Sequence, residues 1–308
     1  MHGAYAANMA VSNCDVLFSI GTRFNDRITG KLHEFAPHAQ IIHIDIDTAS
    51  ISRNIHVDIP IVADAREALT KASEYVENYT SQKWLNEISG WKQEHPLAMR
   101  PNDRLSPVDI INEINQQFDE AIIVTDVGQH QMLVSQYAQI TPGKQLIMSG
   151  GLGTMGYGFP GGVGAKIGNP DKPVIVISGD GGMQMNIQEF ATAVLEELPL
   201  ILCVFNNEYL GMVRQWQDLF YGQRYSATVL NDQVDFVKVS EGMGAKAYRV
   251  ADIESFEKAL KEAIELNIPC VIECDICKDD KVFPMVAPGA PISEAFDRDD
   301  LNKKESTN

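Results

Sequence analysis

The chain has 308 residues, and at roughly 150 residues per domain this length predicts two domains. Hydrophobic residues make up 44% of it and charged residues 22%, which is typical of a globular protein and excludes a disordered or fibrous one. The formal net charge is −17, so most of the surface would repel a phosphate backbone. A nucleic-acid partner is therefore not expected.

Targeting signals are not evident. No apolar stretch of the sequence reaches the roughly 18 residues that a membrane-spanning helix needs. The first residues lack the basic start and the apolar centre of a signal peptide. The five cysteines favour a reducing compartment over a disulfide framework. We therefore expect a cytoplasmic protein with no membrane partner.

The last three cysteines have the spacing C-x3-C-x2-C, which would allow a metal site. Residues 269–276 are predicted to form a strand, in which alternate side chains point to opposite faces. Cys270 and Cys274 are then expected on one face and Cys277 on the other. Because no fourth ligand is evident either, a zinc site is not expected.

The first part of the chain alternates β-branched runs with polar, helix-like stretches, as α/β domains do. Strands are expected at 15–21, 41–47 and 59–65, and a helix at 65–77. Residues 79–104 are polar and are expected to be a linker. The predicted first domain covers 1–78.

The second domain is predicted to cover 105–290 and to resume the same alternation. Ser106 is expected to cap a helix that has Pro107 at its first position. Strands are expected at 121–128, 145–151, 174–182, 200–207 and 269–276. The predicted fold class is thus α/β, with a parallel sheet covered by helices on both faces. Residues 291–308 are charged and are expected to be a mobile tail.

A helix is expected between the strands at 174–182 and 200–207. Asn186 and Glu189 have the spacing of a capping pair. Apolar residues follow at the intervals of one helical face. These residues are Ile187, Phe190, Ala191, Val194, Leu195 and Leu198. The segment therefore predicts a βαβ unit.

Two polar residues follow the strands of this unit. Asp180 comes after the first strand and Asn207 after the second. In a right-handed βαβ unit both parallel strands end at the same edge of the sheet, so these side chains are expected to converge. Carboxylate and amide oxygens suit Mg²⁺, whose remaining positions a ligand's phosphate can fill. The glycines at 179, 181 and 182 would let backbone amides approach that phosphate. Alternatively, Asp180 caps the next helix and Asn207 turns the chain.

The sequence GDG, followed about 25 to 30 residues later by NN, resembles the signature of thiamine-diphosphate enzymes. With GLGTMGYGFPGGVGA upstream and NNEYLGMVRQWQ downstream, nearly the whole chain resembles the large subunit of acetohydroxyacid synthase, also called acetolactate synthase. The resemblance implies decarboxylation of pyruvate on thiamine diphosphate and carboligation to a second 2-keto acid, pyruvate or 2-ketobutyrate. This reaction belongs to branched-chain amino acid biosynthesis.

The resemblance also implies site residues. The implied magnesium ligands are Asp180, Asn207 and the backbone carbonyl of Tyr209. Implied contacts of the cofactor are Val127, Gly128, Gln129, His130, Gly153, Met155, Gly179, Asp180, Gly181, Gly182, Asn207, Tyr209, Gly211, Met212 and Val213. Met155 matches the apolar side chain that bends the cofactor. Trp216 and Phe220 match the pocket of the second keto acid. Core packing is the alternative for Met155 and Trp216.

A competing reading comes from Gly151–Gly156, which satisfies the dinucleotide-binding pattern G-x-G-x-x-G. That fold would place an acidic residue at the end of the next strand, about 20 positions on. Asp171 lies instead in the turn GNPDKP. An NAD-dependent dehydrogenase is therefore the weaker alternative.

The first domain carries arginines and acidic residues that would suit a nucleotide, or alternatively form a surface salt-bridge cluster. The resemblance implies a partial FAD-binding middle domain, truncated and Rossmann-like. Its matching contacts are Gly21, Arg23, Arg27, Asp45, Ile46 and Asp64. Asn25 departs from the family, which has Asp in this position.

Met1–Gly3 matches an internal stretch of the resembled family, so the amino-terminal domain is expected to be missing. In the family that domain carries the glutamate that activates the cofactor, and a neighbouring subunit contributes it. We therefore assign no catalytic acid or base in this chain. The resemblance further implies a homo-oligomer, a dimer or tetramer, with a possible regulatory small subunit. A catalytically silent fragment, or half of a split enzyme, that only binds the cofactor is the alternative.

Overall fold

A computed structural model describes residues 3–99, 104–230 and 234–305 of the chain. Parts of the expected linker (100–103) and of the expected tail (306–308) lie outside the described residues. The chain divides into two compact units. Unit 1 comprises Met1–Ala98 and Phe283–Asn308, and unit 2 comprises Met99–Val282.

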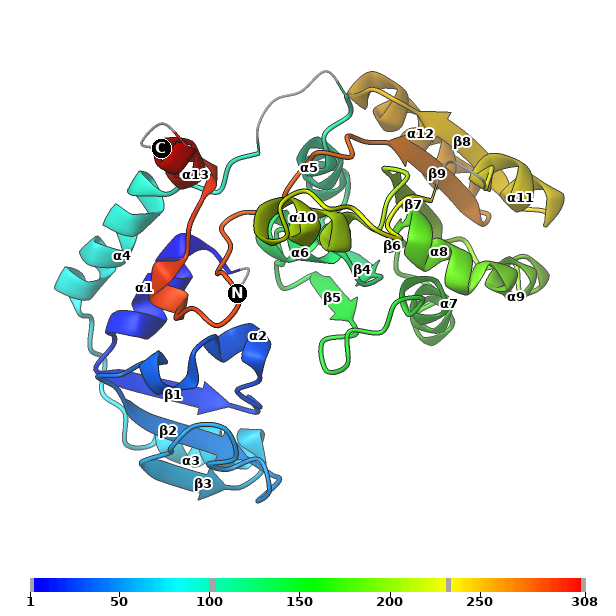
Figure 1. The fold of residues 1–308 in the computed structure, drawn as a ribbon. Helices are drawn as coiled ribbons and strands as arrows, with labels where there is room; N and C mark the ends of the chain where they lie inside the picture. The colour runs from blue at the N-terminus through cyan, green and yellow to red at the C-terminus, as the bar shows by residue number, and fades with distance from the viewer. Residues whose placement is uncertain (1–2, 100–103, 231–233, 306–308) are drawn as a thin grey trace. The chain divides into compact units, whose positions relative to one another are not determined.

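Unit 2 is built on a six-stranded parallel sheet (Figure 1, green to orange). Its strands are β4 (Ala121–Thr125), β5 (Lys144–Met148), β6 (Val174–Gly179), β7 (Ile201–Asn206), β8 (Lys246–Val250) and β9 (Cys270–Asp275). Their order in space is β5-β4-β6-β7-β9-β8. The strands predicted near 121, 145, 174, 200 and 269 are confirmed, with shorter bounds. The edge strand β8 was not predicted.

Helices cover both faces of this sheet, which confirms the predicted fold class. One face packs against α5 (Pro107–Gln117), α6 (Gln129–Tyr137) and α12 (Ile253–Leu266). The other packs against α7 (Gly158–Gly168), α8 (Asp180–Met185), α9 (Phe190–Leu195) and α11 (Phe236–Gly242). Neighbouring strand residues alternate between the two cores: Ile123 belongs to the first and Val124 to the second. A strand buried on both faces reads as a continuous apolar run, which is why these strands were recognisable.

The helix predicted at Ser106 is confirmed, because α5 begins at Pro107 and the Ser106 side chain accepts a hydrogen bond from Val108 N at 3.2 Å. The prediction of one helix from a capping pair at Asn186 is wrong. The chain instead forms α8, a 3₁₀ turn η2 (Ile187–Glu189) and the short α9. Asn186 makes no cap; its Nδ2 donates to Gly156 O at 2.6 Å. That tertiary contact competes with the local one.

The predicted apolar face of this segment is also only partly correct. Phe190 is buried, whereas Leu195 is 79% exposed. Ala191 is exposed as well. Between α8 and α9 the chain forms a 3₁₀ turn in place of α-helix, so a single α-helical spacing does not describe which side chains are buried.

Unit 1 contains a three-stranded parallel sheet in the order β1-β2-β3. Its strands are β1 (Val16–Ile20), β2 (Gln40–Asp45) and β3 (Ile59–Val62). All three strands were predicted, and the predicted ranges were slightly longer than the observed ones. Its helices are α1 (Tyr5–Asn13), α2 (Asp26–Thr29), the 3₁₀ turn η1 (Leu32–Glu34), α3 (Ala65–Ser73) and α4 (Gln82–Glu94).

The end of the chain also belongs to unit 1. It forms the 3₁₀ turn η3 (Ile292–Glu294) and helix α13 (Arg298–Glu305). Ile292 is 2% exposed and packs in the core of unit 1 with Phe24 and Phe35. This arrangement differs from the mobile tail that the charged sequence predicted. Likewise, the expected linker contains helix α4. The rings of Trp84 and Trp91 on this helix pack edge to face, with their centroids 5.8 Å apart.

Among the described residues, no helix combines the length and the apolar character that crossing a membrane would require.

Candidate functional site

The central strands of unit 2 create the site at their carboxyl ends. Strand β4 lies between β5 and β6, so the chain leaves β4 toward one side of the sheet and β6 toward the other. Ligands of open α/β sheets bind at such a reversal of direction. The segment after β4 begins with Asp126, and helix α8 follows β6 directly at Asp180. Strand β7 pairs with β6 and runs into Asn207.

A pocket that is open to solvent lies at this edge of the sheet. Fourteen of the fifteen residues predicted to contact the cofactor line it. They are Val127, Gly128, Gln129, His130, Met155, Gly179, Asp180, Gly181, Gly182, Asn207, Tyr209, Gly211, Met212 and Val213. The fold therefore brings four separate stretches of sequence to one place.

Three predicted residues are not among those that line the pocket. Gly153 lies in the loop before α7 with a φ of +64°, a conformation that favours glycine. Trp216 and Phe220 lie on helix α10 (Gly211–Phe220), where their rings meet edge to face at 5.4 Å.

Asp180 is the strongest candidate ligand for a cation. It is 4% exposed, and its Oδ1 accepts a hydrogen bond from Gly181 N at 2.8 Å. Its Oδ2 is buried without a hydrogen-bond partner among the described residues. Burial raises the pKa of this carboxyl to about 7, although backbone hydrogen bonds oppose the shift. An adjacent divalent cation would offset that cost of burial.

The two asparagines at the end of β7 have different surroundings. Asn207 lines the pocket, and its Oδ1 accepts from Tyr209 N at 3.0 Å. Asn206 Nδ2 instead donates to Glu273 Oε1 at 2.8 Å, inside the sheet. Glu273 also pairs with Arg249, at 3.0 Å. Asn206 is therefore part of a buried polar network, and Asn207 faces the site.

His130 is the second residue of α6 and is buried, with 7% of its surface exposed. Its ring lies against Gly128 and Gly179, where an added Cβ atom would approach Cε1 to 2.9 and 3.1 Å. Burial lowers the pKa of His130 to about 4, although the charge of Asp126 acts in the opposite direction. The imidazole is therefore neutral near pH 7. Its Nε2 has no hydrogen-bond partner in the described part of the chain.

Asp126 holds the glycine-rich loop in place, a role that the sequence did not reveal. Its Oδ1 accepts from Val127 N at 2.7 Å and from Gly156 N at 3.0 Å, and its Oδ2 accepts from Gly158 N at 2.7 Å. These are amides that a dinucleotide pyrophosphate would need at the start of a helix. Because Asp126 occupies them, the G-x-G-x-x-G match does not favour a dehydrogenase.

Nine further lining residues were not predicted from the sequence, and five of them lie in the segment after β9. They are Pro107, Leu133, Phe205, Leu210, Ile276, Cys277, Asp280, Lys281 and Val282. The segment 276–282 follows β9, which ends beside β7 at the same edge. The sequence offered one signal for this segment, because it follows the predicted strand at 269–276, whose carboxyl end lies beside that of β7 and Asn207. As expected, Cys270 and Cys274 share one core face with Cys203, whereas Cys277 lies outside the strand.

In unit 1, residues predicted to contact FAD follow the ends of the three strands. Gly21 follows β1 with a φ of +62°, and Asp45 ends β2. Asp64 follows β3, and its Oδ1 accepts from Arg66 N and Glu67 N at the start of α3. The remaining predicted contacts are exposed, two of them in the loops after β1 and β2 and one, Arg27, in the short helix α2. They are Arg23, Arg27 and Ile46.

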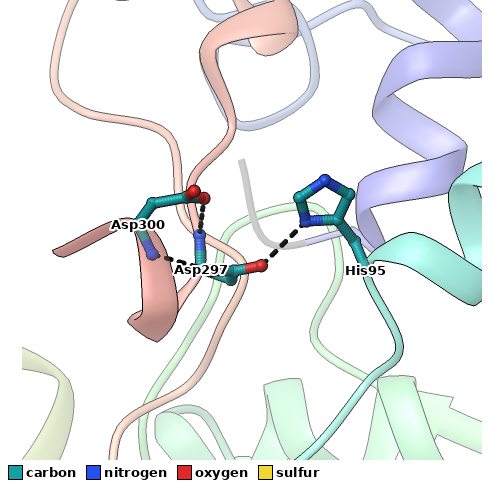
Figure 2. A group of neighbouring side chains, drawn as sticks. All are labelled: His95, Asp297 and Asp300. Carbon is teal, nitrogen blue, oxygen red and sulfur yellow. Dashed lines mark hydrogen bonds and ion pairs between the residues drawn. The ribbon is translucent and has the colours of Figure 1, made fainter. Parts of the chain in front are cut away.

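Among the residues that the structure describes, one cluster of possible metal ligands lies outside the pocket (Figure 2). His95 Nδ1 is 2.8 Å from Asp297 Oδ2. Asp297 and Asp300 each accept a hydrogen bond from the other's backbone amide at 3.0 Å, which closes the first turn of α13. The carboxylates thus already serve as helix caps, so this cluster is structural.

Comparisons with known proteins agree with the pocket. The model of the thiamine pyrophosphate enzyme C-terminal TPP-binding domain matches residues 126–274, and that of the central domain of these enzymes matches 1–72. Thiamine pyrophosphate is another name for thiamine diphosphate. The C-terminal match begins directly after β4 and includes β6 and β7; the carboxyl ends of these three strands form the site.

Whole sequences give the same result. The acetolactate synthase large subunit of Cyanidium caldarium is 42% identical over 304 residues, which cover 96% of this chain and 52% of that protein. The probable acetolactate synthase large subunit of Methanocaldococcus jannaschii is 43% identical over 304 residues, 95% of this chain and 51% of that protein. The acetolactate synthase large subunit of Corynebacterium glutamicum is 43% identical over 308 residues, 96% of this chain and 49% of that protein.

The chain therefore belongs to the thiamine pyrophosphate enzymes. Within that family it is homologous to the large subunits of acetolactate synthases. It spans about half the length of the curated relatives that it matches.

Proposed function

We propose that unit 2 binds Mg²⁺ and thiamine diphosphate, and that the chain takes part in an acetolactate synthase reaction. In that reaction pyruvate is decarboxylated and its two-carbon unit is joined to a second 2-keto acid, pyruvate or 2-ketobutyrate. The observation that carries the proposal is the buried, unpartnered Oδ2 of Asp180 in the same pocket as Asn207.

The donor set suits a magnesium diphosphate. A carboxylate oxygen of Asp180 and the amide oxygen of Asn207 are hard ligands, and the carbonyl of Tyr209 is a third candidate. Gly181 and Gly182 lie in the first turn of α8, where main-chain amides and the positive end of the helix favour a phosphate group. The neutral His130 can donate or accept at its unpartnered Nε2 without adding charge.

When bound, thiamine diphosphate supplies the ring that stabilises the carbanion left by decarboxylation. The chain's own residues bind and orient it. Met155 offers an apolar surface beside Gly181, where an added Cβ atom would lie 3.7 Å from the Met155 methyl group. Asp126 fixes the loop that carries Met155, because it accepts from the amides of Gly156 and Gly158.

The substrate and partner assignments rest on the relatives. Trp216 and Phe220 are proposed to border the second keto acid from α10, whose residues Met212 and Val213 line the pocket. The proposal includes a regulatory small subunit, for which the words "large subunit" in the relatives' names are the support. It also includes a homo-oligomer, which rests on the family resemblance of the sequence alone. A chain that binds the cofactor without turnover is the alternative outcome.

Isothermal titration calorimetry with Mg²⁺ and thiamine diphosphate tests the proposal. Asp180→Asn should weaken Mg²⁺-dependent binding by at least about tenfold, because it removes a charged ligand. The matched control is Asp119→Asn, at an exposed position outside the pocket. Equal affinity in all three proteins would overturn the metal assignment.

The stability of the metal-free protein separates loss of a ligand from misfolding. Asp180→Asn replaces a buried carboxylate that lacks a cation, so thermal unfolding without Mg²⁺ should occur at the same temperature or higher. Added Mg²⁺ and cofactor should raise the unfolding temperature of the wild type but not of this variant.

FAD is proposed as a second ligand, for unit 1. The supporting observation is that Gly21, Asp45 and Asp64 follow neighbouring parallel strands at one sheet edge, with exposed Arg23 and Arg27 beside them in the sequence. Titration of FAD, followed by quenching of flavin fluorescence, tests it. Arg23→Ala should weaken binding. If the wild type leaves flavin fluorescence unchanged, the proposal that unit 1 binds FAD is wrong.

A further inference from the structure

Gln215 is a polar side chain in an unexpected place. It belongs to α10 and is 2% exposed, the lowest exposure on that helix. It is absent from the lining of the pocket, although Met212 and Val213 of the same helix line it. Because a buried amide is costly unless it is hydrogen-bonded, its partners indicate what it does.

Those partners come from two other walls of the pocket. Gln215 Oε1 accepts from Gln129 Nε2 at 2.8 Å and from Val282 N at 2.9 Å. Gln215 Nε2 donates to Val282 O at 2.9 Å. One amide thus joins α10 both to the loop after β4 and to the segment after β9. Gln129 Nε2 reinforces the junction by donating to Asp280 O at 3.0 Å.

Gln129 is also held from the side by Gly211. A Cβ atom at residue 211 would overlap Gln129 Oε1, so the glycine leaves the space that this side chain fills. Gln129 Oε1 therefore packs closely against the backbone of Gly211, while its Nε2 is held by Gln215. The position of the loop from Val127 to His130 follows from both contacts.

Two ion pairs run beside this junction. Arg214 lies 2.7 Å from Asp279, and Asp218 lies 2.9 Å from Lys281. Asp279 is 58% exposed, so water screens its pair with Arg214, whereas the side chains of Lys281 and Asp218 are only 22% and 17% exposed. The buried hydrogen bonds of Gln215 and the pair of Asp218 with Lys281 therefore both restrain the spacing of the walls.

We propose that Gln215 is a positioning residue that holds Gln129 and Val282 at the walls of the pocket and thereby sets the affinity for thiamine diphosphate. The inference rests on the proposed function of this pocket. Gln215 acts through Gln129 and the segment 280–282, without touching the ligand itself.

The chain provides a matched control two residues further along α10. Gln217 Nε2 donates to Ser226 O at 3.0 Å, and Gln217 Oε1 accepts from Ser226 N at 3.2 Å. This is the same pair of side-chain to backbone bonds, but neither Gln217 nor Ser226 lines the pocket. Gln215→Met and Gln217→Met therefore both remove a pair of side-chain to backbone bonds from one helix, buried beside the pocket for Gln215 and exposed away from it for Gln217.

Calorimetry with thiamine diphosphate at saturating Mg²⁺ compares the two variants. Gln215→Met should weaken binding by about tenfold, and Gln217→Met by less than about threefold. The affinities of Gln129→Met and of the double variant Gln129→Met/Gln215→Met complete a double-mutant cycle, which measures how far the effects of the two residues on cofactor binding depend on each other. If Gln215 acts through Gln129, the double variant should bind no more weakly than the weaker single variant.

Circular dichroism verifies the fold of each variant. If Gln215→Met does not fold, Gln215→Glu replaces it, because that side chain keeps the acceptor toward Gln129 and loses only the donor toward Val282. It should bind with an affinity between those of wild type and Gln129→Met. Equal affinities of Gln215→Met (or its replacement) and Gln217→Met overturn the inference. A wild type that binds no cofactor instead overturns the proposed function.

Discussion

The carboxylate of Asp126 fills the space beside Gly182 that a side chain would otherwise occupy. A Cβ atom at residue 182 would overlap Asp126 Oδ1 and lie 2.8 Å from its Cγ. The same carboxylate accepts the amides of Gly156 and Gly158 from the glycine-rich loop. The absence of a side chain at Gly182 is therefore a condition for holding that loop against the sheet.

Gly182→Ala should consequently displace Asp126. The expected loss is about 1–3 kcal/mol in the free energy of unfolding, because an added methyl group overpacks a buried contact. Urea unfolding followed by far-ultraviolet circular dichroism measures it. The control is Gly164→Ala in α7, where an added Cβ meets nothing within 4 Å. That variant should be unchanged or more stable by up to about 1 kcal/mol, since alanine is the better helix former.

Asp126→Asn tests the hydrogen bonds themselves. The amide has one acceptor oxygen where the carboxylate has two, and it cannot accept from all three backbone amides that Asp126 holds. Losing a hydrogen bond to a charged group costs about 1.5–3 kcal/mol. Hydrogen exchange should accelerate at Gly156 and Gly158, and unchanged protection there would contradict the assignment.

Substitutions of the two asparagines at the end of β7 should affect different properties, the stability of the fold for Asn206 and the affinity for Mg²⁺ for Asn207. Asn206→Ala removes a partner of Glu273, whose side chain is 3% exposed, so the free energy of unfolding should fall by about 1–3 kcal/mol. Its Mg²⁺ affinity should remain near that of wild type. Asn207→Ala should do the reverse, with a loss of Mg²⁺ affinity and a small change in stability. The prediction fails if both variants change the same quantity.

The sequence predicted what depends on near neighbours along the chain. Apolar strands such as β6 and β7 were recognisable because both of their faces are buried. The cap at Ser106 was recognisable because its bond spans two residues. Strand β8 was missed because the sequence Lys246–Val250 mixes charged with apolar side chains at the edge of the sheet.

Contacts between distant parts of the chain could not be predicted. Asn186 has the sequence spacing of a helix cap, yet Gly156, 30 positions earlier, takes its side chain. Gln215 reaches Val282 across 67 positions. The residues proposed to touch the cofactor were found from motifs, whereas Asp126 and Gln215, which hold those residues in place, became visible only in the structure.

Ile292 anchors the carboxy-terminal segment in the core of unit 1. It is 2% exposed, so Ile292→Ala should lower the free energy of unfolding of this unit by about 2–4 kcal/mol. Fluorescence of Trp84 and Trp91, both on α4, reports on unit 1. The matched control is Ile28→Ala, because Ile28 is 43% exposed and its truncation should cost less than about 1 kcal/mol. Similar losses in both variants would indicate that the segment is not held by its apolar anchor.

The contact between His95 and Asp297 should make unit 1 sensitive to acid (Figure 2). Burial alone would raise the pKa of Asp297, but the hydrogen bonds from His95 and from the Asp300 amide outweigh it and hold the pKa below its usual range. Tyr5 stacks on the His95 ring at 3.7 Å from the side of α1. A carboxyl with a lowered pKa in the folded state stabilises the protein above its unfolded pKa of about 3.9, and that contribution is lost as pH falls through the folded value.

Asp297→Asn isolates this contribution, because asparagine still caps a helix but carries no charge. At pH 7 the variant should unfold at a lower urea concentration than wild type. The difference should shrink as pH falls from about 5 through 3, because protonation of Asp297 removes the same charge from the wild type. Asp299→Asn, at the exposed neighbouring position on α13, should track the wild type throughout. If the difference in unfolding midpoint between Asp297→Asn and wild type stays constant with pH, the charge of Asp297 does not stabilise the fold. The contact with His95 would then contribute through packing and uncharged hydrogen bonds.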